Sequence, residues 1–305
     1  MAELRQKGFK HLPELVKSDS AEERAYLEDV AIGAVDWLLK QISTESRRLL
    51  WLLTQALEEV PEALLQAIYS GLSEYDEFLL QVQQFLADKA QLPAELQEML
   101  DALPPEIIAQ ATHFQADAKA LSPIAPLLNE LLQKGLVQKE SDSVHFHELV
   151  RERCDCWMQQ HPDETEGLTA QQVLQRYGER YVAIFKALRE NNKIGESIEA
   201  GRRALTYFCR AQAFEALMGF ASRFITSTND QQTLQAVIAE LQALLPLVPE
   251  GQARWSLNTC LADALVRSGQ SQAALPFYQQ AASAAEQAEH WPGLAAICHN
   301  WGELY

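Results

Sequence analysis

The C-terminal part of the sequence repeats its own pattern, and this feature constrains the fold most. Leu261 precedes Leu265 by four residues, and Trp301 precedes Tyr305 by four, so that the pattern recurs at an offset of 40 residues. Repeats of this length are typical of helix-turn-helix arrays. Because each unit of such an array buries its apolar face against its neighbours, we expect a solenoid of stacked helices here.

Helices are also predicted for the N-terminal part of the chain. Apolar residues recur at spacings of three and four over residues 22–42, which is typical of an amphipathic helix. Ser43 then precedes an apolar run as a helix N-cap, and Gly71 ends a second helix after a short proline turn. This pair resembles a helix-turn-helix. Residues 74–112 are acidic, rich in glutamine and interrupted by prolines, and we interpret them as helices of an insertion.

A different pattern follows in residues 123–158. A helical segment is broken near Gly135, residues 143–146 alternate like a strand, and helical spacing then returns. A helix, two short strands and a helix form the order of a winged helix. A polar stretch at residues 159–169 is the predicted linker to the repeats. We therefore expect an all-α chain with a small β-hairpin wing, divided into an N-terminal helical arm (1–42), a helix-turn-helix-like domain with an insertion (43–118), a winged-helix domain (119–160) and helical repeats (168–305).

The composition restricts the partners and the location of the chain. It holds 42 acidic and 25 basic residues, which gives a formal net charge of −17. Such a charge repels phosphate backbones and anionic lipids, and argues against nucleic acid or a membrane as a partner. The sequence has no apolar signal segment, and its five scattered cysteines fit reduced thiols. We expect a cytoplasmic protein.

The sequence offers no recognisable enzyme site. His145, His147, Cys154 and Cys156 lie close together along the chain, as metal ligands often do. The two cysteines, however, would lie about 200° apart around a helix, and could not both contact one ion. No nucleophile with a positioned base is apparent, and no G-x-x-x-x-G-K-[ST] phosphate loop occurs. We expect neither catalysis nor a metal, and no cofactor bound by this chain alone.

The region 123–157 resembles the winged-helix domain of STAND nucleotide-switch proteins, which include the NB-ARC ATPases. Members carry a Met-His-Asp pattern at the start of the last helix of this domain, and Phe146, His147 and Glu148 occupy that place here. In the family this histidine contacts the β-phosphate of ADP. The resemblance therefore implies an ADP phosphate contact for His147 in an intact protein that binds ADP or ATP. The alternative is a structural histidine that ties the helix to the wing. The residues that carry the resemblance are Leu127, Leu128, Leu131, Leu132, Gly135, Leu136, Val137 and the run from Phe146 to Glu152.

The C-terminal repeats resemble tetratricopeptide (TPR) repeats. The matching positions are Leu261, Ala262, Leu265, Gly269, Ala274, Tyr278 and Ala281, with Ala262 for the family's Gly and Leu265 for its Tyr. We predict paired helices over residues 257–266 and 272–285. Polar residues on the other face of the first helix are expected to line a groove for a protein or peptide ligand: Asn258, Asp263 and Arg267.

These patterns lead to one hypothesis and two alternatives. Because the sequence lacks a phosphate loop and ends within a repeat, we expect a fragment whose ATPase core, a nucleotide-binding domain in cis, lies outside it. The hypothesis is a non-catalytic regulatory and sensor fragment of a STAND-type protein. Its winged helix would relay the nucleotide state, and its repeats would bind a protein or peptide trigger. The alternatives are a winged-helix, DNA-binding transcription regulator and a stand-alone TPR scaffold.

Overall fold

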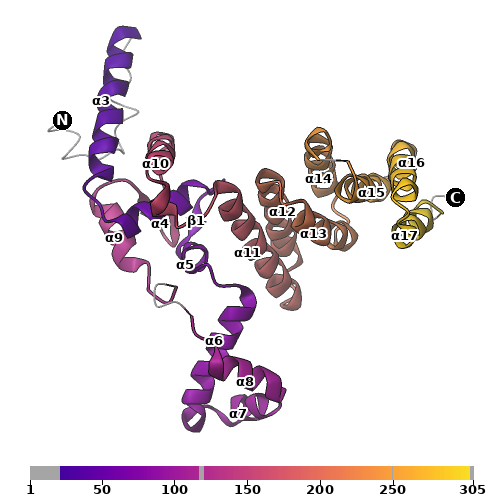
Figure 1. The fold of residues 1–305 in the computed structure, drawn as a ribbon, viewed down its shortest axis with the longest axis horizontal. Coiled ribbons are helices and arrows are strands. Elements are labelled where there is room, and N and C mark those ends of the chain that lie inside the picture. Colours follow the sequence, from indigo (N-terminus) through magenta and orange to yellow (C-terminus); the bar gives the residue numbers. More distant parts are fainter. Residues whose placement is uncertain (1–20, 117–119, 249, 303–305) are drawn as a thin grey trace. The chain divides into compact units, whose positions relative to one another are not determined.

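The computed structural model describes residues 21–116, 120–248 and 250–302 (Figure 1). The chain divides into two compact units, Met1–Leu168 and Thr169–Tyr305. This division coincides with the predicted start of the repeats at residue 168. Both units are built from helices, and the described strands form one small sheet in the N-terminal unit. Of the predicted N-terminal arm, residues 1–20 lie outside the described part of the chain.

The N-terminal unit is organised around its second described helix, α4. Helix α4 begins at the predicted place, because the Ser43 hydroxyl accepts a hydrogen bond of 3.2 Å from the Ser46 amide. Its leucines are fully buried, since α9 and α10 both pack against it. Gly71 ends α5 in the left-handed conformation, with φ of 66°. The helices are α3 (Ala21–Leu39), α4 (Thr44–Thr54), α5 (Glu62–Ser70), α9 (Ala125–Gln133) and α10 (Glu148–Gln160).

A three-stranded antiparallel sheet joins parts of the sequence that we had assigned to separate domains. Strands β2 (Gln138–Glu140) and β3 (Ser143–His145) form the predicted hairpin. Strand β1 (Val60–Pro61) was expected as a turn, but Val60 pairs with Val144, and the strand order is β1-β3-β2. In the sequence, we had placed a domain boundary at position 118, within residues 43–160. The β1–β3 pairing joins the segments on either side of it.

Arg47, Glu164 and Trp157, which we call the Arg47 cluster, attach part of the predicted linker to this unit. Arg47 forms two hydrogen bonds to the Glu164 carboxylate, of 2.7 and 2.8 Å, and also donates to the carbonyls of Leu39 and Ile42. Its guanidinium lies 5.1 Å from the centre of the Trp157 ring, and the indole N–H donates to Glu164 at 3.2 Å. Residues 162–165 form the short helix η3 (Pro162–Thr165), which packs on α4 and α10. This part of the predicted linker therefore packs as a helix against the N-terminal unit.

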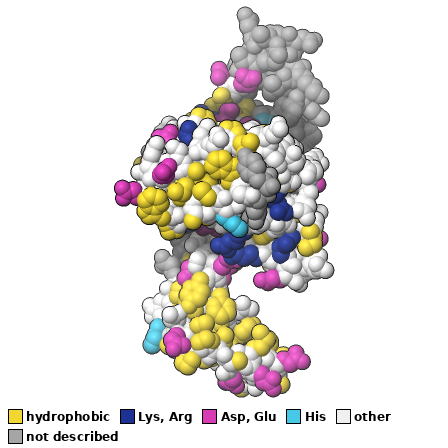
Figure 2. Space-filling model, turned by 90° about the vertical axis from the view of Figure 1, so that its right-hand side faces the viewer, with side chains coloured by type: hydrophobic (Ala, Val, Ile, Leu, Met, Phe, Trp, Pro, Cys, Tyr) yellow, Lys and Arg dark blue, Asp and Glu magenta, His cyan; other side chains and the backbone are white. Residues whose placement is uncertain are grey.

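Residues 74–113 form a small helical module with a core of its own, which we call the insertion module. It comprises α6 (Glu74–Ala87), η2 (Lys89–Gln91), α7 (Ala94–Asp101) and α8 (Pro105–His113). Prolines precede α7 and α8 as predicted, since proline fits a first helical turn but not a helix interior. Leu79, Val82, Leu100 and Ala111 form the core. Figure 2 shows hydrophobic side chains gathered over this module, in the lower part of the view, with acidic side chains at the borders.

The C-terminal unit is a succession of seven described helices. Helix α11 packs on α12, α15 on α16, and α16 on α17, in the manner of antiparallel helix pairs. Helices α13 and α14 pack mainly on α12 and α15, and less on each other. The elements are α11 (Ala170–Glu190), α12 (Ile194–Ala211), α13 (Phe214–Ser227), α14 (Gln231–Leu244), η4 (Leu245–Leu247), α15 (Gln252–Arg267), α16 (Ser271–Gln287) and α17 (Trp291–Gly302).

The structure confirms the predicted register of the pair α15 and α16. Gly269 lies between the helices with φ of 80° and donates to the carbonyl of Val266, while Gln270 donates to that of Leu265. This is the Schellman arrangement, for which glycine is suited because it has no Cβ. The residues that we expected to be buried are all at most 2% exposed: Leu261, Leu265, Ala274, Tyr278 and Ala281.

Glycines allow close helix approaches in this unit, two of them against phenylalanine rings. A Cβ added to Gly178 on α11 would overlap the ring of Phe208 on α12, and one added to Gly201 on α12 would overlap Phe224 on α13. Phe224 is held in turn by Phe185 and Phe220, at centroid distances of 5.8 and 5.7 Å. The helices approach at these points because glycine leaves room for an aromatic ring.

Candidate functional site

The structure places the three predicted groove residues of α15 in three different surroundings. Asn258 is 3% exposed. Asp263 is partly buried and Arg267 is exposed, and each is hydrogen-bonded to a neighbouring part of the unit. The three side chains therefore do not line one groove together.

Asp263 connects α15 to the two helices that follow it. Its carboxylate accepts a hydrogen bond of 2.5 Å from the Tyr278 hydroxyl on α16, and bonds of 3.2 and 3.4 Å from the Asn300 amide on α17. Tyr278 is 1% exposed, so its hydroxyl has little access to water. The geometry indicates that Asp263 holds adjacent helices together.

Arg267, in the last turn of α15, connects this helix to the preceding part of the unit. Its guanidinium donates to the carbonyl of Thr228 at 3.2 Å and to the side chain of Asn229 at 2.6 Å, both in the connection between α13 and α14. A cation in the last turn of a helix also interacts favourably with the helix dipole. Arg267 thus stabilises the packing of consecutive helices.

Asn258 borders a polar groove of about 510 Å³ between α15 and α16. Its side-chain oxygen is buried and has no hydrogen-bond partner among the described residues. Because a buried polar atom of this kind is costly, the oxygen is suited to accept a hydrogen bond from a ligand. The other lining residues are Glu250, Arg254, Pro276, Gln279, Gln280, Ser283, Ala284 and Gln287.

Most residues of this groove were missed in the sequence, although a signal was present. Gln279, Ser283 and Gln287 follow one another at spacings of four, which places them on one side of α16. Gln280 adds another amide beside them. Arg254 lies one turn before Asn258 on α15, and its guanidinium donates to the carbonyls of Leu245 and Val248. Amides and a hydroxyl offer both hydrogen-bond donors and acceptors along this side of the groove.

His147 is the N-cap of α10, two residues after the end of strand β3. Its Nδ1 accepts a hydrogen bond of 3.2 Å from the Leu149 amide, so the side chain caps the helix. The imidazole is exposed, and its Nε2 forms no hydrogen bond with the described residues. The side chain thus has a structural role as a helix cap, and the exposed ring can still meet a group from outside the chain.

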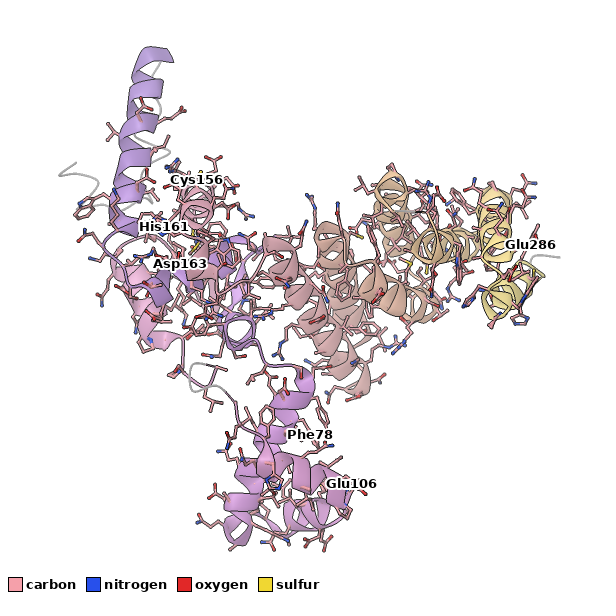
Figure 3. The ribbon with its side chains drawn as sticks, in the orientation of Figure 1. Phe78, Glu106, Cys156, His161, Asp163 and Glu286 are labelled. Atoms are coloured by element: carbon pink, nitrogen blue, oxygen red, sulfur yellow. The ribbon has the colours of Figure 1, made fainter. Side chains whose placement is uncertain are left out.

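The neighbouring cysteines differ in their surroundings. Cys154 is buried, which raises the pKa of its thiol well above the usual range and makes the thiolate inaccessible. Cys156 is partly exposed on α10 (Figure 3). In the described part of the chain, no three His, Cys, Asp or Glu side chains gather closely enough to hold a metal ion.

Helix α9 would be the recognition helix of a DNA-binding winged helix, and its charge is unsuited to that task. Its exposed positions are neutral, and the one charged residue within its bounds is Glu130. The Glu130 carboxylate accepts hydrogen bonds from the hydroxyls of Ser43 and Ser46, at 2.7 and 2.5 Å. Lys139, in the hairpin, is paired with Glu62. Lysines and arginines supply most of the affinity for DNA phosphates, and neither residue occurs within α9.

The comparisons with known proteins assign no family to this chain. No protein-family model, no curated protein and no solved structure matches it. Among the described residues, no helix combines the length and the apolar character needed to cross a membrane.

Replacing Asp263 with alanine is expected to destabilise the C-terminal unit by about 1–2 kcal/mol, because the buried Tyr278 hydroxyl loses its acceptor. From the sequence alone, Asp263 was expected to line a groove for a ligand. Asp263→Asn keeps an oxygen acceptor and should recover part of the loss. Glu286→Ala removes an exposed acid on α16 (Figure 3) and should change the free energy of unfolding by less than about 0.5 kcal/mol. Urea unfolding followed by circular dichroism measures all three, and equal midpoints for Asp263→Ala and the parent would contradict this role.

Proposed function

We propose that this chain is a non-catalytic regulatory module, in which a winged helix is followed by TPR-like repeats that bind a protein or peptide. The order α4, β1, α5, α9, β2, β3 supports the first part. It is the order of a winged helix, with the insertion module placed between its second and third helices. The strand order β1-β3-β2 fits the same assignment.

The observation that carries the binding function is the polar groove between α15 and α16. A peptide lying along it would find the unpartnered oxygen of Asn258 and the amides of Gln279 and Gln280. Hydrogen bonds from these groups would recognise backbone as well as side chains, and the buried oxygen would gain the partner it lacks. The stacked helices provide a rigid support for this surface.

His147 supports the proposal of a nucleotide switch of the STAND type. The resemblance assigns it a contact with the β-phosphate of ADP, and the exposed ring at the start of α10 leaves Nε2 available for such a contact. A separate nucleotide-binding domain in cis would hold the ADP or ATP. In this proposal the winged helix relays the nucleotide state, and the capping bond to Leu149 keeps the ring oriented.

Two matched substitutions on α16 test the peptide-binding function. Peptides selected from a random display library on the full chain, and then synthesised, are expected to bind with micromolar affinity. Gln280→Trp places a bulky ring in the groove and should lower the affinity for these peptides at least about tenfold, a loss of about 1.4 kcal/mol in binding free energy. Gln272→Trp makes the same change at an exposed position of α16 outside the groove, and should leave the affinity unchanged. The proposal fails if selection enriches no binder, or if both variants bind the peptides equally well.

A further inference from the structure

The insertion module carries an apolar groove between α6 and α7 that the proposed winged-helix and repeat functions do not use. Its volume is about 290 Å³. The floor is formed by Val82 and Leu100, which belong to the core of the module. The remaining lining residues are Phe78, Gln81, Phe85, Leu96, Met99 and Leu103.

Large apolar side chains at this groove are open to solvent. Met99 is 66% exposed and Phe78 is 37% exposed, and Tyr75, one turn earlier on α6, is 50% exposed. Phe78 projects from α6 beside the groove (Figure 3). A contiguous apolar surface on a small module, bordered by polar residues, is typical of a protein-binding site.

The border of the groove is acidic. Residues 74–113 contain eight acidic residues and one basic residue, Lys89. Lys89 is paired with Asp101, so its charge is compensated within the module. Glu95 and Glu98 are exposed on α7, next to the lining residues Leu96 and Met99. A ligand with an apolar face and basic flanks would therefore complement this surface in both respects.

We propose that this groove binds an amphipathic helix with lysines or arginines along its flanks, supplied by another protein. Two parallel walls of helix side chains form a groove that an incoming helix can fill with residues spaced at i, i+3, i+4 and i+7. A second copy of this chain would bring the same acidic border and would be repelled. Anionic lipid headgroups and acidic peptides are disfavoured for the same reason.

The test uses the full chain and a labelled peptide of about 18 residues, with leucines at the i, i+3, i+4 and i+7 positions and lysines on both flanks. Fluorescence anisotropy should give a micromolar dissociation constant that rises with ionic strength, since salt screens the flanking charges. A peptide with the same leucines and glutamates in place of the lysines should not bind. Equal binding of the two peptides, or binding of neither, would overturn the proposal.

Three variants locate the binding. Met99→Asp introduces a charge at an exposed lining position. The border variant, Glu95→Lys with Glu98→Lys, reverses two charges beside the groove. Each variant should lower the affinity for the basic peptide at least about tenfold. Glu106→Lys reverses one charge on α8, against two in the border variant, at a residue that does not line the groove (Figure 3), and should have a much smaller effect per charge reversed. If Glu106→Lys weakens binding of the peptide by half or more of the border variant's effect in free energy, the peptide responds to overall charge alone and the assigned groove is wrong. A concentration-dependent dimer that Met99→Asp abolishes would identify a second copy as the occupant and would also overturn it.

Discussion

Replacing Arg47 with alanine is expected to lower the free energy of unfolding of the N-terminal unit by about 3–5 kcal/mol, since removal of one partner from a buried ion pair leaves the other uncompensated. The Arg47 and Glu164 side chains are 12% and 9% exposed. The substitution also leaves the carbonyls of Leu39 and Ile42 without this donor, and removes the cation from the Trp157 ring. Denaturant unfolding, with hydrogen exchange to assign the change to residues 21–168, measures the effect.

The same ion pair predicts a dependence on pH. Burial raises the pKa of Glu164, but the hydrogen bonds and the charge of Arg47 outweigh this and hold the pKa below its ordinary value. A carboxyl whose pKa is lowered on folding contributes stability above its unfolded pKa, about 4.5, and loses it as the pH falls through the folded value. The difference in stability between the parent and Arg47→Ala should therefore be largest near neutral pH and shrink below about pH 4.

Two controls distinguish the Arg47 cluster from ordinary ion pairs. Arg47→Lys keeps the charge but cannot form the two-pronged contact with Glu164, and should recover only part of the loss. Lys89→Ala breaks an exposed pair with Asp101, and should cost less than about 1 kcal/mol. A loss below 1 kcal/mol for Arg47→Ala would show that the cluster does not hold η3 to this unit.

Replacing Ala274 with tryptophan is expected to destabilise the C-terminal unit by about 1–3 kcal/mol or more, because the added ring has no space between α15 and α16. Ala274 is fully buried, in the same helix as Tyr278 and Ala281. An indole there must displace α16 or its neighbours, and α16 also supports α17. The variant should melt at a lower temperature, with the loss of hydrogen-exchange protection greatest in residues 252–302.

The adjacent alanine provides a matched control. Ala273→Trp makes an identical change at an exposed position of α16, and should alter the free energy of unfolding by less than about 0.5 kcal/mol. The comparison removes the effects of the tryptophan itself, such as its helix propensity. If Ala274→Trp melts like the parent, position 274 does not require a small residue, and the packing that we predicted for this helix pair is wrong.

Much of the secondary structure followed from the sequence, because its signals are local. The cap at Ser43, the left-handed Gly71 and Gly269, and the apolar spacing of Leu261 and Leu265 each act within one or two turns of a helix. The hairpin of β2 and β3 is local in the same sense. Helix ends and buried faces could therefore be located without any knowledge of tertiary contacts.

The tertiary structure decided how these elements combine. Two-residue β1 has no recognisable strand pattern, and becomes a strand only because Val60 meets Val144, 84 positions along the chain. The polar stretch that contains Glu164 has the sequence of a linker. It packs against the unit because Glu164 supplies the counter-charge for the largely buried Arg47. Asp263 looks like a groove residue by helical phase alone, but its neighbours Tyr278 and Asn300 engage it. In each case a distant residue supplies the partner, and a sequence shows which side chains need partners without showing which ones they find.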